Sequence, residues 1–263
     1  MNILDKIIAR KREEVLTAKT TSSLETLSDS PLFHRTCYSL KDHLLDPNTS
    51  GIIAEYKRAS PSKGLINGTA SVKDTVSAYQ HAGASAVSVL TDADFFQGSL
   101  QDLLAAREVL NIPLLRKEFI VDPFQIAEAK AYGADIILLI AACLESAAID
   151  ELAAYAHQLG LNVLLEIHNQ EELDRSPLQH IDAIGVNNRN LKDFSVSLDH
   201  SRDLVDQIPQ SHLKISESGL SDPGTIRDLK SIGYQGFLIG ENFMKTNAPG
   251  QVIEQFISEI HPG

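Results

Sequence analysis

The chain has 263 residues, of which 43% are hydrophobic, and it carries a formal net charge of −12. This length accommodates one large domain or two small ones, with enough apolar residues for a sizeable core. The negative charge argues against nonspecific nucleic-acid binding, which needs a basic surface, so we expect no nucleic-acid partner. An anionic small molecule would need a locally basic pocket on this acidic protein.

The start of the chain predicts no membrane segment, and the two cysteines indicate the compartment. Residues 1–19, MNILDKIIARKREEVLTAK, interrupt their apolar positions with charges, unlike a signal peptide or a spanning helix. Cys37 and Cys143 lie far apart and form neither a metal motif nor a redox motif. Two free thiols suit a reducing compartment, so we expect a cytoplasmic protein with no membrane partner.

The first part of the chain predicts a helical extension. Ile3, Leu4, Ile7 and Ile8 form an apolar stripe at helical spacing, and a polar connection follows around residues 22–31. We expect residues 1–48 to be this extension and residues 49–263 to form the rest of a single domain, 1–263.

From residue 51 onward, a short apolar run, a polar loop and an amphipathic stretch recur about eight times. The apolar runs are GIIAEYK, AVSVLTD, PLLRKEF, DIILLIAA, NVLLEIH, AIGVNNR, LKISES and GFLIG. Apolar strands alternating with helices predict a parallel sheet covered by helices, and eight units fit an α/β fold of the (βα)8 TIM-barrel type. The alternative, an open doubly wound sheet, normally carries a GxGxxG turn after its first strand, which this chain lacks.

Capping signals support the same division into elements. Asp122-Pro123 and Asp222-Pro223 read as an N-cap followed by a first-turn proline. Glycine favours the left-handed conformation that ends many helices, and four glycines stand where C-caps are expected: Gly83, Gly133, Gly160 and Gly233.

Polar residues concentrate at the carboxyl ends of six predicted strands. They are Glu55 and Lys57, Thr91 and Asp92, Lys117 and Glu118, Glu166 and His168, Asn187 and Arg189, and Glu217 and Ser218. In a closed parallel barrel these ends meet at one mouth, where barrel enzymes place their active sites. Side chains alternate along a strand, so residues two apart, such as Glu55 and Lys57, should face inward together. Six charged ends converging on one mouth therefore predict a catalytic site.

The ends of strands seven and eight predict a phosphate site. The stretches SESGL and LIGENF carry small residues that allow backbone N–H groups to approach an anion, and Lys57 adds a cation. Phe95, Phe96 and Phe119 follow strand ends, where they either pack or line a pocket for an aromatic substrate. There is no HxH, HExxH or paired-cysteine spacing, so we expect no metal.

Several stretches together resemble one enzyme family. They are ILDKIIARKREEV, IAEYKRASPSKG, VLTDADFFQGS, LLRKEFIVDPFQI, LLEIHN, IGVNNRNLKDF, SESGL and FLIGENFMK. In this order on eight strands they resemble the indole-3-glycerol-phosphate synthases along almost the whole chain. The resemblance implies a carboxy-lyase of tryptophan biosynthesis that acts on 1-(2-carboxyphenylamino)-1-deoxyribulose 5-phosphate. It implies ring closure with loss of CO₂ and water, no cofactor and no metal, and an N-terminal extension over the barrel mouth.

The resemblance also assigns catalytic roles. Lys117 would be the general acid and Glu166 the general base of the later dehydration, with Glu55 and Lys57 completing the site. How the acid role divides between Lys117 and Lys57 stays open. We expect nearby cations to lower the pKa of the acidic lysine.

The remaining site residues are implied to hold the substrate. Asn187 and Arg189 would hold the carboxylate and the developing hydroxyl, with Glu217 nearby. The residues implied for the phosphate, the ribulose and the anthranilate ring are Ser60, Phe96, Phe119, Ser218, Gly219, Gly240 and Glu241.

Some positions depart from the family pattern, and two other functions stay open. Tyr56 should face the helix layer, and Glu241 should leave the phosphate contact to its backbone N–H. One alternative is a Schiff-base lyase in which Lys117 attacks a carbonyl, and another is a phosphate-binding barrel without turnover. The sequence leaves the oligomeric state open, as a monomer or a weak homo-oligomer.

Overall fold

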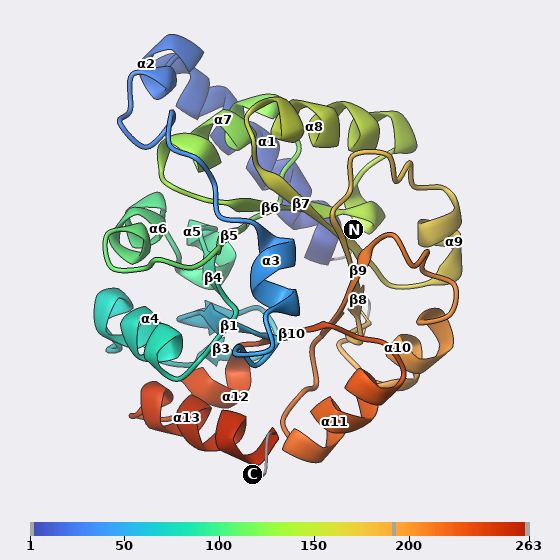
Figure 1. The fold of residues 1–263 in the computed structure, drawn as a ribbon. Coiled ribbons are helices and arrows are strands. Elements are labelled where there is room, and N and C mark those ends of the chain that lie inside the picture. The colour runs from blue at the N-terminus through green and yellow to red at the C-terminus, as the bar shows by residue number, and fades with distance from the viewer. Residues whose placement is uncertain (1–2, 191–192, 261–263) are drawn as a thin grey trace.

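Eight parallel strands close into a barrel in this computed structural model, which describes residues 3–190 and 193–260. Around the barrel the order is β1-β10-β9-β8-β7-β6-β5-β4 (Figure 1). The barrel strands are β1 (Ile52–Tyr56), β4 (Ala86–Leu90), β5 (Leu114–Lys117), β6 (Ile136–Ile140), β7 (Asn162–Ile167), β8 (Ala183–Asn187), β9 (Leu213–Glu217) and β10 (Gly236–Ile239). Each lies within one of the eight apolar runs, so the predicted barrel is confirmed. A short antiparallel ribbon, β2 (Ala59–Ser60) and β3 (Gly64–Leu65), follows β1.

Helices cover the outside of the barrel. They are α1 (Ile3–Thr21), α2 (Leu24–Ser28), α3 (Leu40–Leu45), α4 (Val72–His81), α5 (Ala93–Phe96), α6 (Leu100–Arg107), α7 (Pro123–Ala131), α8 (Ser146–Gln158), α9 (Gln170–Asp174), α10 (Asp199–Leu204), α11 (Pro223–Ser231), α12 (Glu241–Met244) and α13 (Pro249–Ile260), with a 3₁₀ turn η1 (Ala141–Cys143). Helices α9 and α10, with five and six residues, are too short to display a helical period in the sequence.

The predicted caps are confirmed. The side chains of Asp122 and Asp222 accept backbone N–H groups at the starts of α7 and α11, and a proline follows each. The four glycines predicted at helix C-termini all have positive φ: Gly83, Gly133, Gly160 and Gly233.

Alternate residues of each strand point to two apolar layers. In β1, Ile53 packs inside the barrel, whereas Ile52 and Ala54 pack between the strands and the helices. Tyr56 belongs to the outer layer, as expected, and its hydroxyl donates to the carbonyl of Ala70 at 2.8 Å. This alternation brings the next inward residue after Ile53, Glu55, to the mouth.

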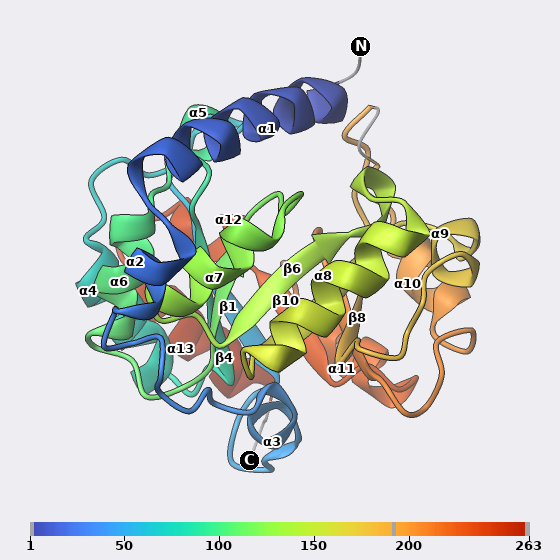
Figure 2. The ribbon, with the colours of Figure 1, turned by 90° about the horizontal axis from the view of Figure 1, so that it is seen from above.

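The N-terminal extension is divided between the two ends of the barrel. Helix α1 crosses the mouth, whereas α3 covers the opposite end (Figure 2). Leu40 and Leu44 of α3 pack in the same apolar cluster as Ile53, Leu213 and Ile215, inside the barrel. Residues 1–48 were expected as a whole over the mouth, but part of them is needed elsewhere because the lower strand ends expose apolar side chains that must be covered.

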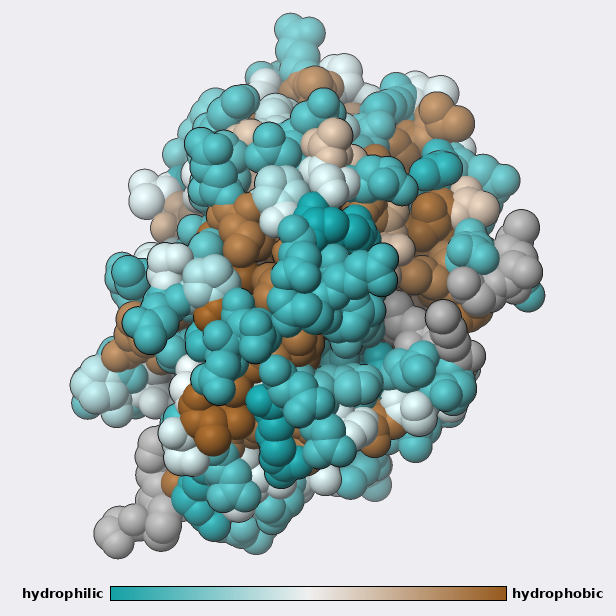
Figure 3. Space-filling view, turned by 90° about the vertical axis from the view of Figure 1, so that its right-hand side faces the viewer, coloured by the Kyte–Doolittle hydropathy of each residue, from teal (hydrophilic) through white to brown (hydrophobic). Residues whose placement is uncertain are grey.

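The outer surface of one side of the barrel is mainly hydrophilic. On the side of the barrel that carries α9 and α10, hydrophilic residues dominate the surface, with apolar residues between them (Figure 3). Across residues 3–190 and 193–260, no helix combines the length and the apolar character needed to cross a membrane.

Candidate active site

Glu55 and Lys57, on the first strand and just beyond its end, form a buried ion pair at the mouth. Glu55 Oε1 lies 2.6 Å from Lys57 Nζ, and both side chains are largely buried. Pairing offsets the cost of desolvating the two charges. The carboxylate needs a neighbour without a side chain, because a Cβ on Gly240 would lie 2.4 Å from Glu55 Oε1. Gly240 therefore serves the placement of Glu55.

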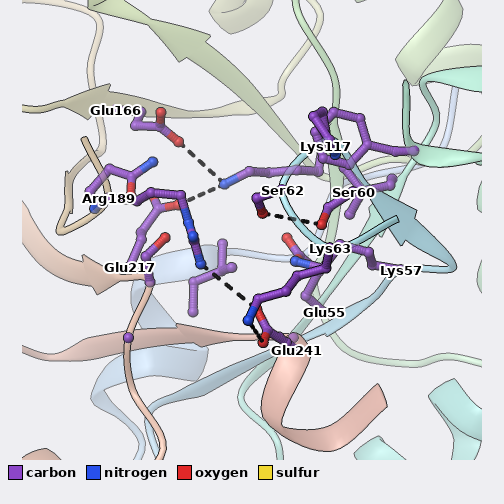
Figure 4. A pocket seen from close by; sticks show the side chains of 18 of the residues that line it. Glu55, Lys57, Ser60, Ser62, Lys63, Lys117, Glu166, Arg189, Glu217 and Glu241 are labelled. Carbon is purple, nitrogen blue, oxygen red and sulfur yellow. Dashed lines mark hydrogen bonds and ion pairs between the residues drawn. The ribbon is translucent and has the colours of Figure 1, made fainter. Parts of the chain in front are cut away.

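Lys117 lies at the centre of the mouth, between two carboxylates. Its Nζ donates to Glu217 Oε2 at 2.6 Å and lies 3.4 Å from Glu166 Oε2 (Figure 4). Burial by itself lowers the pKa of Lys117, but Glu217, Glu166 and Glu55 outweigh it and raise the pKa above its ordinary value. The expectation that nearby cations lower this pKa is wrong, because the nearest charges are carboxylates. Lys117 is therefore an ammonium ion with a proton to donate.

The two carboxyl groups beside Lys117 differ in their ionisation. Burial raises the pKa of Glu217 to about 7, against the opposing effect of Lys117. Burial acts on Glu166 in the same direction, but Lys117, His168 and a hydrogen bond from Asn187 lower its pKa below the ordinary value. The site thus holds one carboxylate that is ionised at neutral pH, Glu166, beside one that titrates near neutral pH, Glu217.

A cavity of about 580 Å³ opens above these groups and brings together all the predicted site residues. They are Glu55, Lys57, Ser60, Phe96, Lys117, Phe119, Glu166, Asn187, Arg189, Glu217, Ser218, Gly219, Gly240 and Glu241. Their individual roles remain predictions. One wall is apolar: the rings of Phe96 and Phe119 lie 6.1 Å apart, whereas Phe95 is not part of the lining.

Other lining residues were not predicted. Ile3, Leu4 and Ile7 of α1 form a roof, and Lys63 adds a cation. The apolar stripe of α1 and the SPSKG stretch that contains Lys63 were both visible in the sequence. The resemblance implied that the extension lies over the mouth, but which of its residues line the cavity, and that Lys63 joins them, depends on how α1 and the β1–α4 connection fold back.

The side of the cavity formed by the ends of β9 and β10 combines strained backbone with charged side chains. Ser218 and Gly219 both have positive φ, at 68° and 75°, a conformation that costs energy for serine. The side chain of Glu241 reaches toward the cavity: its carboxylate lies 3.3 Å from Lys63 Nζ and 3.7 Å from Arg189 Nη2 (Figure 4). These two cations converge where an anion would enter.

The expectation that six charged strand ends converge at one mouth is only partly correct. Asp92 and Glu118 bind Lys11 of α1, at 2.9 and 3.0 Å, and Thr91 donates to Glu118 at 2.8 Å. Glu118 directly follows the strand, and it lines the cavity although its carboxylate is bound by Lys11 and Thr91. His168 lines a cleft beside the cavity, behind Glu166.

The closed barrel and its charged mouth define the class of protein as a (βα)8-barrel enzyme with a pocket for a small anionic molecule. Two solved structures share the fold at low sequence identity. A mutant tryptophan synthase alpha-subunit from the hyperthermophile Pyrococcus furiosus has a TM-score of 0.60 at 13% identity, over 81% of this chain and 98% of that one. A native KDPGal structure has a TM-score of 0.56 at 15% identity, over 80% and 91%.

Sequence comparison gives the family. The family model for indole-3-glycerol phosphate synthase matches residues 4–256. The indole-3-glycerol phosphate synthase of Bacteroides thetaiotaomicron is 48% identical over 98% of this chain and 99% of that protein. The synthase of Burkholderia ambifaria is 41% identical over 95% and 97%. The chain belongs to the indole-3-glycerol phosphate synthase family, decarboxylating lyases of tryptophan biosynthesis that act on a small phosphorylated substrate.

Proposed function

We propose that the chain closes the indole ring of 1-(2-carboxyphenylamino)-1-deoxyribulose 5-phosphate by general acid and base catalysis, with Lys117 as the acid. The observation that carries this proposal is the position of Lys117, whose ammonium group is held by Glu217 and Glu166 inside the cavity. As the aromatic carbon attacks the ribulose carbonyl, Lys117 donates a proton to the carbonyl oxygen. The ring carbon that formed the new C–C bond then loses its carboxyl group as CO₂, and the electron pair of the broken bond restores the aromatic ring.

Glu166 is the proposed base of the dehydration. Its lowered pKa keeps it ionised at neutral pH, so it can take the proton whose loss accompanies departure of the hydroxyl group. Lys57, paired with Glu55, orients the anionic substrate and is the second candidate for the acid. Asn187 positions Glu166 and the leaving hydroxyl.

The two ends of the cavity suit the two ends of the substrate. Phe96 and Phe119 form a wall for the anthranilate ring, and Arg189 faces its carboxylate. The phosphate binds to the loops after β9 and β10, with Ser60 alongside. The proposed phosphate residues are Ser218, Gly219, Gly240 and Glu241. Glu241 contributes its backbone N–H to the phosphate, and Lys63, which pairs with the Glu241 carboxylate in the free protein, turns to the phosphate instead.

The remaining properties are proposals from the sequence and the family. We propose one domain over 1–263 with an N-terminal extension over 1–48, no cofactor or metal, a cytoplasmic location, and a monomer or weak homo-oligomer. Among residues 3–190 and 193–260, no three His, Cys, Asp or Glu side chains are grouped as a metal site would require.

The contacts of Lys117 with Glu217 and Glu166 disfavour the Schiff-base alternative. An amine must be neutral to attack a carbonyl, whereas these two carboxylates raise the pKa of Lys117 and favour its ammonium form. Borohydride added with substrate would trap a covalent adduct only if Lys117 forms an imine.

The direct test of the proposed function uses a property of the sequence. The chain contains no tryptophan, so indole emission from product stands out against weak tyrosine emission. Purified protein given the substrate, with chelator present, should produce indole emission while the anthranilate-type emission of the substrate falls. The Lys117→Ala protein, prepared identically, controls for contaminating enzyme. Flat emission with folded protein would favour a phosphate-binding barrel without turnover.

A further inference from the structure

A histidine lies behind Glu166, between the cavity and a separate cleft. His168 follows β7 directly, and its Nε2 is 3.5 Å from Glu166 Oε1. Nε2 is buried and has no hydrogen-bond partner among the described residues. The other edge of the ring reaches a polar side cleft lined by His168, Asn169, Gln170, Asp174, His200, Asp203, Leu204 and Gln207.

Glu172 fixes the orientation of the imidazole. Glu172 Oε2 accepts the backbone N–H of His168 at 2.8 Å and lies 3.1 Å from Nδ1. An ionised carboxylate only accepts hydrogen bonds, so Nδ1 must carry a proton. Nε2 therefore points at Glu166 either as a bare lone pair or as the second N–H of an imidazolium.

These two states leave room for exactly one shared proton between Glu166 and His168. If Glu166 is ionised, an imidazolium donates toward it from Nε2. If Glu166 is protonated, a neutral imidazole accepts from it. Two lone pairs facing each other in a buried site would be unfavourable, so the two groups titrate as a pair.

A purely structural role explains only part of this arrangement. Helix α9 is already capped by Asn169, whose side chain accepts the N–H of Glu172, and Glu172 is held by the backbone N–H of His168. Neither contact uses the imidazole Nε2. The remaining neighbour of that nitrogen is the proposed base, Glu166.

We propose that His168 is a positioning residue whose imidazolium shares its Nε2 proton with Glu166 and thereby keeps that carboxylate ionised and ready to act as the base. The inference rests on the proposed function, because it assumes that Glu166 takes a proton from the substrate.

Charged groups from several elements surround the imidazole. Burial lowers the pKa of His168, but Glu172, Glu166 and Glu217 raise it above the ordinary value. On the cavity side, Lys117 pairs with Glu166 and offsets part of its negative charge. On the other side, the ionisable groups of Asp174, His200 and Asp203 line the side cleft. The carboxylates favour the imidazolium form of His168, and its charge in turn helps to keep Glu166 ionised.

The first test measures titration without turnover. Side-chain NMR of the nine histidines, with the His168 signal assigned from its absence in His168→Gln, should give a pKa above 6.5. Replacing Glu166 by Gln removes a neighbouring negative charge, so the pKa of His168 should fall by about one unit. An unchanged pKa in Glu166→Gln would overturn the shared proton.

The second test measures turnover against pH. In His168→Gln, kcat should fall about tenfold with KM unchanged, because the residue acts through Glu166. Loss of the imidazolium raises the pKa of Glu166, so the acidic limb of the kcat profile should move about one unit to higher pH. Added imidazole should partly restore kcat of His168→Ala through the side cleft.

The matched control is another histidine paired with a carboxylate. His157 Nε2 lies 2.9 Å from Asp182 Oδ2, away from the cavity, so His157→Gln should leave kcat and its pH profile unchanged. If His168→Gln matches wild type while Glu166→Gln is inactive, only the role of His168 fails. If Glu166→Gln is fully active, the proposed base is wrong, and the NMR result still decides whether the two groups share a proton.

Discussion

Two adjacent residues of the third barrel strand end, Lys117 and Glu118, belong to two charged clusters that serve different purposes. The active-site cluster consists of Glu55, Lys57, Lys117, Glu166 and Glu217 and opens into the cavity. The anchor cluster consists of Lys11, Glu14, Asp92 and Glu118 and joins α1 to the strand ends. Both clusters are built from lysines and carboxylates at the same end of the barrel.

The clusters differ in what their charged groups face. In the anchor cluster one buried ammonium, Lys11, contacts three carboxylates, and Arg116 adds a further cation 3.7 Å from Glu118. Each cluster keeps one buried carboxylate oxygen without a hydrogen bond among the described residues, on Asp92 and on Glu217, but only Glu217 lines the cavity, and its pKa is raised to about 7. Ion pairs beneath α1 hold that helix in place, whereas a group that titrates near neutral pH beside a cavity is suited to chemistry.

Removing the ammonium of the active-site cluster should have the largest effect. In Lys117→Ala, kcat should fall by ~10²–10⁴ or more, because the proton donor of the ring closure is lost. Binding should remain measurable by quenching of substrate fluorescence. If kcat survives within a few-fold, Lys117 is not the acid and Lys57 takes that role.

Neutralising the proposed base should have the next largest effect. Glu166→Gln preserves the shape of the side chain but cannot accept the proton, so kcat should fall by ~10²–10³ while the fold is kept. Single-turnover mixing with product quantified by chromatography measures this. Indole formation at the wild-type rate would remove Glu166 from the mechanism.

Breaking the anchor cluster should change binding and stability more than chemistry. Lys11→Met leaves Asp92 and Glu118 without their buried counter-ion, which should cost about 1–3 kcal/mol, since partial undocking of α1 lets water reach the carboxylates. KM should rise several-fold because Ile7 and its neighbours roof the cavity, while kcat stays within a few-fold.

The control for Lys11 is an exposed lysine in an ion pair. Lys73 pairs with Glu108 on the surface, so Lys73→Met should leave the melting temperature and KM close to wild type. If Lys11→Met lowers kcat as much as Lys117→Ala does, the two clusters are not functionally distinct.

The smallest expected effect is a change in pH dependence. With its pKa at about 7, Glu217 is neutral below that pH and becomes a carboxylate above it, adding negative charge where an anionic substrate binds. The wild-type kcat/KM should therefore fall a few-fold as pH rises through 7, and Glu217→Gln should lack this limb. Identical profiles for the two proteins between pH 6 and 8 would contradict this titration.

The sequence by itself determined the barrel and the content of its mouth. Strand runs, helix caps and the two-residue alternation are local properties, so residues such as Glu55, Lys117 and Glu166 could be assigned to one inward-facing set. The motifs and their order also indicated the family, and the match of the family model to residues 4–256 confirms it. Short elements such as α9 could not be predicted, because five residues do not complete a recognisable helical period.

Tertiary structure alone decided how the charges are paired. Glu118 lines the cavity with Lys117, as the sequence indicated, but its ion pair with Lys11 could not be predicted. We expected cations to lower the pKa of Lys117, whereas the fold surrounds it with carboxylates. The tertiary structure also places α3 at the end of the barrel opposite the mouth, and it brings the imidazole of His168 next to the carboxylate of Glu166. Electrostatic energy depends on distances through space between groups far apart in the chain, and those distances exist only once the barrel has closed.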